Sequence, residues 1–238
     1  MSEPATGIYN AMNKGVRKSK GDYIIVMNTD DYYHNENAIK SLVRALETDN
    51  VEYACASSQR LAMGGKKRIV KPNLASYLFR MPFDHNSMLL KRELFDRYGG
   101  FDEQYKLAAD YDFIFKVCSN RTSAAVSQEI VTCFRSGGAS STMKAISYSE
   151  VEAIHEKFYK GSITTETLKK IGGKKLGLYG YLQATSLEIP KNLKKELLEY
   201  FNTSYWKGYI FNLLKAKNTI KAIEDLISRK KKQPRCLR

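Results

Sequence analysis

The sequence has 238 residues, of which 43% are hydrophobic and 27% are charged. This composition is typical of a soluble globular protein and excludes an intrinsically disordered chain. No apolar run reaches about 18 residues, so we expect no membrane-spanning helix. The four cysteines show no CxxC spacing, which argues against structural zinc and favours a reduced, cytoplasmic protein.

The net charge of +14 is unevenly distributed along the chain. Residues 151–238 hold 19 Lys and Arg against 8 Asp and Glu, whereas residues 1–150 hold 20 against 17. A basic region suits an anionic membrane surface, nucleic acid or only solubility. Because no recognised nucleic-acid motif accompanies the charge, we expect no nucleic-acid partner. Peripheral attachment to the inner membrane face is the alternative to a freely cytoplasmic location.

The first predicted elements are a short helix and a strand. Thr6 or Asn10 is suited to cap the helix, and Gly15 to end its first part. Residues 24–27 then form a short, largely β-branched run. A continuous apolar run of this length predicts a strand buried on both faces in a parallel sheet.

Two adjacent acids, Asp30 and Asp31, follow this predicted strand. In open α/β sheets, ligands collect outside the carboxyl ends of the strands. Two neighbouring carboxylates repel each other unless a cation neutralises them. The pair therefore predicts a hard divalent ion, Mg²⁺ or Mn²⁺, that holds a diphosphate. The alternative is a solvated Asp-Asp turn.

The next part of the chain alternates between predicted helices and strands. Four apolar residues at helical spacing are assigned to the core: Ile39, Leu42, Val43 and Leu46. The expected elements are a helix over 37–48, a strand over 51–57, a hairpin or mobile loop over 59–72, a strand over 83–90, a short helix over 91–95, a turn over 98–102, a helix from 108, a strand over 126–134 and a flexible loop over 136–141.

From residue 147 onward the pattern is mostly helical, and a last long helix is expected over about 204–228. We therefore predict two domains. Residues 1–145 form a partial α/β domain, and residues 146–238 form a basic helical region.

Ordered motifs in residues 2–142 resemble those of family 2 glycosyltransferases of the GT-A fold. The motifs are Ser2-Glu3-Pro4, Gly7 to Gly15, Gly21-Asp22-Tyr23, Asn28-Thr29-Asp30-Asp31, His85-Asn86-Ser87, Tyr98-Gly99-Gly100-Phe101-Asp102, Ala109-Asp110-Tyr111-Asp112-Phe113 and Phe134-Arg135 with Gly137-Gly138-Ala139-Ser140. The resemblance implies a GT-A, Rossmann-like mixed sheet flanked by helices. It also implies transfer of a sugar from a nucleotide sugar, UDP- or GDP-linked, to an acceptor hydroxyl.

The resemblance also implies roles for particular residues. Asp31 would bind the metal that bridges the diphosphate, and Asp30 would contact the ribose or a metal-bound water. Asn13 and Lys14 would lie on the donor side. Asp110 falls on the family's general base, and inversion at the anomeric carbon would follow.

Three further residues have alternative interpretations. Asp112 competes with Asp110 as base, although acids in the first turn of a helix also suit the helix dipole. His85 lies where acceptor-side residues are found, or is only a hydrogen-bonded structural residue. His155, from the C-terminal region, either completes the metal site or has no role in it.

The chain departs from its relatives before the first motif. They carry a preceding βαβ segment that holds the nucleotide base, and they commonly have an acid where Ala5 stands. We therefore expect an N-terminally truncated GT-A domain that alone binds nucleotide sugar weakly. The expected function is an inverting, metal-dependent glycosyltransferase that uses a saccharide or lipid-linked acceptor, in cell-surface polysaccharide biosynthesis. The alternative is a catalytically impaired subunit that binds a partner.

Overall fold

The computed structural model describes residues 6–62, 64–78 and 80–159. The chain divides into two compact units, residues 1–170 and 171–238, and all described residues belong to the first. The helix predicted over 204–228 lies outside the described residues. Among the described residues, no helix combines the length and the apolar character that crossing a bilayer requires.

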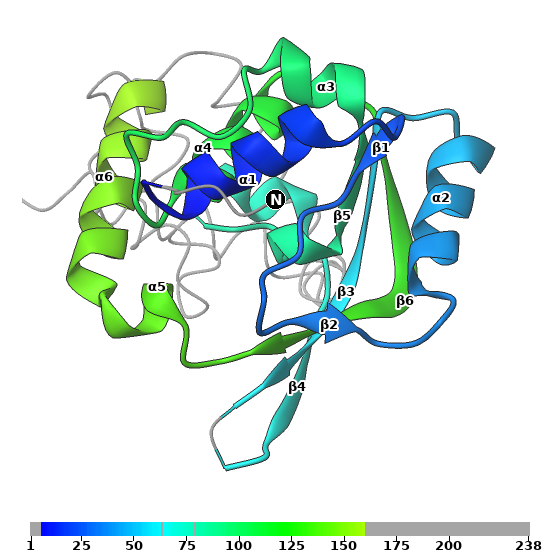
Figure 1. Cartoon of the computed structure of the whole chain (residues 1–238), viewed down its shortest axis with the longest axis horizontal. Coiled ribbons are helices and arrows are strands. Elements are labelled where there is room, and N and C mark those ends of the chain that lie inside the picture. Colours follow the sequence, from blue (N-terminus) through cyan, green and yellow to red (C-terminus); the bar gives the residue numbers. More distant parts are fainter. Residues whose placement is uncertain (1–5, 63, 79, 160–238) are drawn as a thin grey trace, which may run out of the picture. The chain divides into compact units, whose positions relative to one another are not determined.

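One mixed sheet forms the centre of the described unit (Figure 1). Its strands follow the order β1-β5-β3-β6-β2, and β4 pairs with β3 outside this path. Only β3 and β6 run parallel; the other pairs are antiparallel. The strands are β1 (Tyr23–Ile24), β2 (Tyr32–Tyr33), β3 (Tyr53–Leu61), β4 (Lys67–Val70), β5 (Met88–Lys91) and β6 (Ala124–Arg135). The expected mixed sheet is confirmed.

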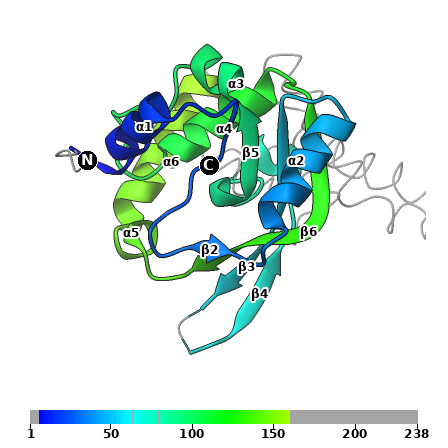
Figure 2. The same cartoon turned by 45° about the vertical axis from the view of Figure 1, so that its right-hand side comes forward.

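Helices cover both faces of this sheet (Figures 1 and 2). On one face, α2 (Ala38–Thr48) buries Leu42 and Leu46 against Ala54 of β3. The assignment of Ile39 to the core is wrong, because this residue is 40% exposed. The other face carries an aromatic cluster in which Phe113 contacts Phe95, Tyr98 and Phe101. The remaining helices are α1 (Ile8–Lys18), α3 (Arg92–Arg97), α4 (Ala109–Ser119), α5 (Ala139–Thr142) and α6 (Lys144–Tyr159), with the 3-10 turns η1 (Leu74–Leu78) and η2 (His85–Ser87).

The strand predicted over residues 24–27 is wrong in extent and direction. Only Tyr23 and Ile24 form strand pairs. They make up β1, which lies at the end of the sheet and runs antiparallel to its neighbour β5. Residues 25–28 continue as half-buried chain without strand pairing. An apolar run reports burial but not the direction of the neighbouring strand, which is why the sequence could not give this result.

The strand predicted over residues 83–90 begins later than expected. His85, Asn86 and Ser87 form η2, and β5 starts at Met88. The Ser87 hydroxyl donates to the carbonyl oxygen of Asp84 at 2.6 Å. Short polar side chains that bond the nearby backbone compete with strand pairing, so this segment turns before the sheet begins.

The predicted domain boundary at residue 145 falls at the start of α6. This helix packs on α4, where Phe158 stacks on Phe115 with 4.2 Å between ring centroids. The Glu150 carboxylate also accepts hydrogen bonds from the backbone amides of Lys106, Leu107 and Ala108, just before α4. Through these contacts α6 supports the start of α4, where Asp110 lies.

Candidate active site

The Asp110 carboxylate lies at the start of α4 and is held from three directions. Its Oδ1 accepts a hydrogen bond from the Tyr9 hydroxyl at 2.8 Å and one from the amide of Tyr111 at 2.9 Å. Its Oδ2 lies 3.2 Å from Nδ1 of His85. The side chain is 16% exposed, so it still reaches solvent. One lone pair on Oδ2 is left for a further proton donor.

These contacts determine how the three groups titrate. Burial favours the neutral form of Asp110. The hydrogen bond and charge of His85, together with the hydrogen bond from Tyr9, outweigh burial and lower the pKa of Asp110. Burial likewise disfavours the charged form of His85, yet Asp110 raises the pKa of His85 above its ordinary value. Burial and the neighbouring Asp110 raise the pKa of Tyr9. Asp110 is therefore ionised at neutral pH beside a hydroxyl that stays protonated.

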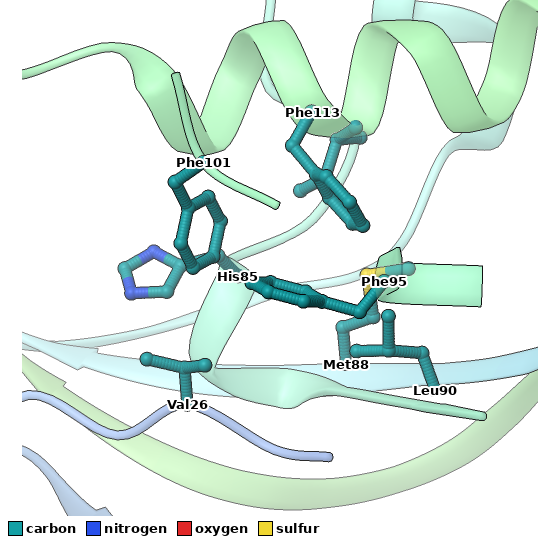
Figure 3. Close-up of a pocket in the computed structure, with 8 residues that line it drawn as sticks. Val26, His85, Met88, Leu90, Phe95, Phe101 and Phe113 are labelled. Carbon is teal, nitrogen blue, oxygen red and sulfur yellow. The ribbon is translucent and has the colours of Figure 1, made fainter. Parts of the chain in front are cut away.

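His85 borders a small cavity (Figure 3). The cavity measures about 20 Å³, and its seven other lining residues are apolar: Val26, Met88, Leu90, Phe95, Phe101, Phe113 and Ile114. A cavity of this size holds roughly one water molecule, whereas ligand pockets usually measure roughly 300–1,000 Å³. This cavity is therefore no sugar site, and the polar contact of His85 is the one with Asp110.

Asp31 is held by three hydrogen bonds from the protein. Its Oδ2 accepts from the side-chain amides of Asn28 at 3.1 Å and Asn86 at 2.9 Å. Its Oδ1 accepts from the backbone amide of Arg135 at 3.0 Å. The side chain is buried, with 9% exposure. Both oxygens of Asp31 are therefore engaged in fixing the loop before β2.

Asp30 has a different environment from its neighbour. It is exposed, and within the described residues it makes no hydrogen bond or ion pair. A methyl group added at Gly138 would lie 3.8 Å from its Oδ2, so the carboxylate lies close to the turn after β6. In the described part of the chain, no three His, Cys, Asp or Glu side chains form a group that could hold a metal ion. Asp30 nevertheless suits Mg²⁺ or Mn²⁺, since such ions are often bound by one or two carboxylates plus substrate phosphates.

The turn η2 brings the two acidic sites together. His85 contacts Asp110, and the next residue, Asn86, donates to Asp31. Asn86 is fully buried, and its Oδ1 accepts from the hydroxyl of Thr132 on β6 at 3.2 Å. Asp31, His85 and Asp110 therefore lie in one neighbourhood, linked by Asn86, to which the sequence assigned no role.

The predicted donor-side residues Asn13 and Lys14 lie on α1. The Asn13 amide donates to the carbonyl of Phe101 at 2.8 Å and to Glu103 at 2.9 Å, and its oxygen accepts from the amide of Phe101 at 3.0 Å. Gly100 has a φ of +69°, and a Cβ there would come within 2.9 Å of Asn13 Oδ1. Asn13 thus fixes the glycine turn before α4. Lys14 is half-buried on the same helix, and donor binding by either residue stays a prediction.

Asp112 of α4 and His155 of α6 each make a contact between these two helices. Asp112 is 0% exposed, and it pairs with Lys116 at 2.6 Å and Lys157 at 3.1 Å. Nε2 of His155 lies 2.8 Å from the hydroxyl of Tyr111. This geometry favours the structural interpretation of both residues over a role as base or metal ligand.

Sequence reasoning missed Tyr9 as part of the site. Tyr9 is buried on α1 and meets Asp110 across 101 residues of chain. An aromatic residue in a short helix looks like an ordinary core position, and only its hydroxyl distinguishes it from phenylalanine. The local sequence carried no signal for this contact.

Comparison with known proteins finds similarity to glycosyltransferases. The model of Glycosyl transferase family 2 matches residues 2–102. PGL/p-HBAD biosynthesis glycosyltransferases of Mycobacterium tuberculosis and Mycobacterium bovis are 25% identical over 119 residues, which cover 48% of this chain and 44% of theirs. The chain thus spans less than half the length of these relatives.

A solved structure supports the fold. S. aureus TarS 1-349 in complex with UDP-GlcNAc matches with a TM-score of 0.51 and 14% identity, over 90% of this chain and 58% of that chain. At this identity the likeness concerns the fold alone, and it agrees with the expected GT-A arrangement of a mixed sheet between helices. The part of the chain that matches the model of Glycosyl transferase family 2 carries Asp30, Asp31, His85 and Asn86.

Proposed function

We propose that this chain acts as an inverting, metal-dependent glycosyltransferase. It would transfer a sugar from a nucleotide-sugar donor to a hydroxyl of a saccharide or lipid-linked acceptor. The observation that carries the proposal is that consecutive residues of η2, His85 and Asn86, contact Asp110 and Asp31. The mycobacterial relatives are named as glycosyltransferases, and this supports the reaction class.

In this proposal Asp110 is the general base. Its Oδ2 takes the proton of the acceptor hydroxyl while the acceptor oxygen bonds to the anomeric carbon. The bond from that carbon to the diphosphate breaks, and the electron pair leaves with the nucleoside diphosphate. Since the lowered pKa keeps Asp110 ionised, the base is ready at neutral pH. Tyr9 and His85 fix the direction of the carboxylate.

The divalent cation of the proposal is assigned to Asp30 rather than Asp31. The exposed carboxylate of Asp30 has its oxygens available, whereas those of Asp31 already accept three hydrogen bonds. When bound, Mg²⁺ or Mn²⁺ would offset the charge that develops on the leaving diphosphate. Asp31 would hold the loop in which Asp30 lies, and outer contacts of this kind typically change metal affinity by about 10–100-fold.

Calorimetry with Mn²⁺ and UDP or GDP tests the donor side. We expect Asp30→Asn to abolish the Mn²⁺-dependent part of the binding, because it removes an anionic ligand from the cation. The matched control is Asp22→Asn, which removes an exposed acid of the preceding turn and should leave binding unchanged. Equal binding by both variants would contradict the assignment of the cation to Asp30. Absence of both binding and transfer in the intact chain would instead favour the partner-binding subunit.

A further inference from the structure

The β3–β4 hairpin carries a concentrated positive charge. From residue 53 to residue 83 the sequence contains six Lys and Arg and no Asp or Glu. Lys66, Lys67, Arg68 and Lys71 are all exposed. In the described part of the chain, none of these four makes an ion pair. This charge is separate from the basic region after residue 150.

Strand register places two cations directly opposite each other. Arg60 of β3 pairs with Arg68 of β4, so both side chains lie on the same face of the hairpin. Arg60 is neutralised by Asp84 and lies 5.3 Å from the ring centre of Phe134. Arg68 has no such carboxylate beside it in the described part of the chain, so its charge is left for an anionic partner.

The shape of the hairpin suits a flat partner. Figures 1 and 2 show the hairpin projecting beyond the rest of the described sheet. Ile69 is 50% exposed between Arg68 and Val70, with Lys71 and Lys67 two residues away on either side. An apolar side chain among cations on a convex element fits a bilayer, in which the apolar group enters the interface and the cations meet phosphates.

The base of the hairpin is fixed to the candidate active site. Arg60 and Ser58 both bond Asp84, the residue before His85. The carbonyl of Leu61 accepts from the amide of Ser136 at 2.9 Å, just before the turn beside Asp30. A surface bound by the hairpin would therefore hold the site in a defined relation to that surface.

We propose that the hairpin over residues 59–71 docks on a bilayer that contains anionic phospholipid. This inference deepens the proposed function and rests on it in one respect: the acceptor is then a lipid-linked saccharide presented at that surface. The docking itself depends on the hairpin alone.

Vesicle co-sedimentation of the full chain tests the docking. Phosphatidylcholine vesicles with and without phosphatidylglycerol are compared for the wild type and for a triple variant, Lys66→Gln, Lys67→Gln and Arg68→Gln. Each cation near an anionic surface contributes roughly a fivefold change in partitioning, so the triple variant should bind anionic vesicles on the order of 10²-fold more weakly. High salt should reduce wild-type binding in the same direction.

A matched variant separates the hairpin from net charge. Lys20→Gln, Lys40→Gln and Arg44→Gln together remove three exposed cations elsewhere in the described unit. This control should keep most of the wild-type binding. A second hairpin variant, Ile69→Asn, keeps every charge and should still weaken binding. Circular dichroism and thermal midpoints confirm that all variants are folded.

Several results would overturn the docking. Equal losses in the two triple variants would mean that only total charge matters, and unchanged binding would exclude the hairpin. Polyuridine that binds through the hairpin more tightly than the vesicles would make it a nucleic-acid surface instead. Since vesicle binding requires no donor, failure here would leave the Asp30 and Asp110 tests of the proposed function intact.

Discussion

Asp110 and Asp112 are the same residue type, two positions apart on α4, yet their surroundings differ completely. They point about 200° apart around the helix, so they face different neighbours. Asp110 meets a histidine and a tyrosine hydroxyl and is 16% exposed. Asp112 meets two lysines and is 0% exposed.

The difference concerns how the charge of each carboxylate is compensated. Lys116 and Lys157 compensate the charge of Asp112 and join α6 to α4. Asp110 retains solvent access and a free lone pair, and its partner His85 can itself exchange a proton. Two acids two positions apart on one helix therefore differ in their partners and exposure, and in the proposed function only Asp110 acts as base.

The largest expected effect comes from Asp110→Asn. The amide is similar in shape but cannot accept the acceptor proton, so the single-turnover rate of sugar transfer should fall by roughly 10²–10⁴-fold. Rapid-quench assays measure that rate with the donor saturating and the enzyme in excess over the acceptor. Donor affinity serves as the control and should not change, and the rate is expressed per folded molecule because loss of the ion pair with His85 also lowers stability. A rate within a factor of about three of wild type would contradict the role of Asp110 as base.

Asp112→Asn should act on stability instead. Removing the carboxylate takes one anionic partner from Lys116 and one from Lys157, although Lys157 keeps Asp102 at 3.8 Å and both lysines are partly exposed. The free energy of unfolding should fall by about 1–3 kcal/mol, measured by urea denaturation. The transfer rate per folded molecule should stay near wild type. A rate loss as large as that of Asp110→Asn would reverse the comparison.

His85→Gln should change the pH dependence of the Asp110 site. Without the imidazole, the pKa of Asp110 rises, so the acid limb of the pH profile of kcat/KM moves to higher pH. His85 has a raised pKa, so its contribution to stability is fully present below its ordinary pKa of 6.5 and is lost as pH rises through the folded value. Denaturation of both proteins across pH 5–9 measures this second effect. A stability difference that grows with pH would contradict the ion pair.

Tyr9→Phe is the mildest of these changes. It removes one hydrogen bond to the Asp110 carboxylate and leaves the ring packed 5.5 Å from that of Phe101. We expect a loss in kcat of roughly tenfold or less, because a hydrogen bond to a charged group contributes about 1.5–3 kcal/mol and only part acts on the transition state. Tyr98→Phe, which alters a hydroxyl paired with Thr122, is the matched control. A larger loss in the control would rule out a specific role for Tyr9.

Local patterns predicted the parts of the fold whose signal lies within a few residues. The spacing of Leu42 and Leu46 predicted α2, and the segment with Gly64 and Gly65 predicted the hairpin. The start of α4 was also predicted, and with it the position of Asp110. By contrast, the direction of β1 depends on β5, more than 60 residues later in the chain, and no local pattern reports it.

The same limit applies to the site. The adjacent acids Asp30 and Asp31 look equivalent in sequence, and the preference for Asp31 as metal ligand came from resemblance. Their difference arises from Asn86 and the backbone of Arg135, which lie 55 and 104 residues from Asp31. Hydrogen-bond partners so far apart in sequence cannot be assigned before the fold brings them together.

A crystal structure of the chain with Mn²⁺ and a nucleotide sugar tests the account most directly. We predict that the cation lies on a carboxylate oxygen of Asp30, with Asp31 still bonded to Asn86. We also predict that the anomeric carbon of the donor faces Oδ2 of Asp110 across the space for one acceptor hydroxyl. A cation on Asp31, or a donor whose anomeric carbon faces away from Asp110, would contradict the account.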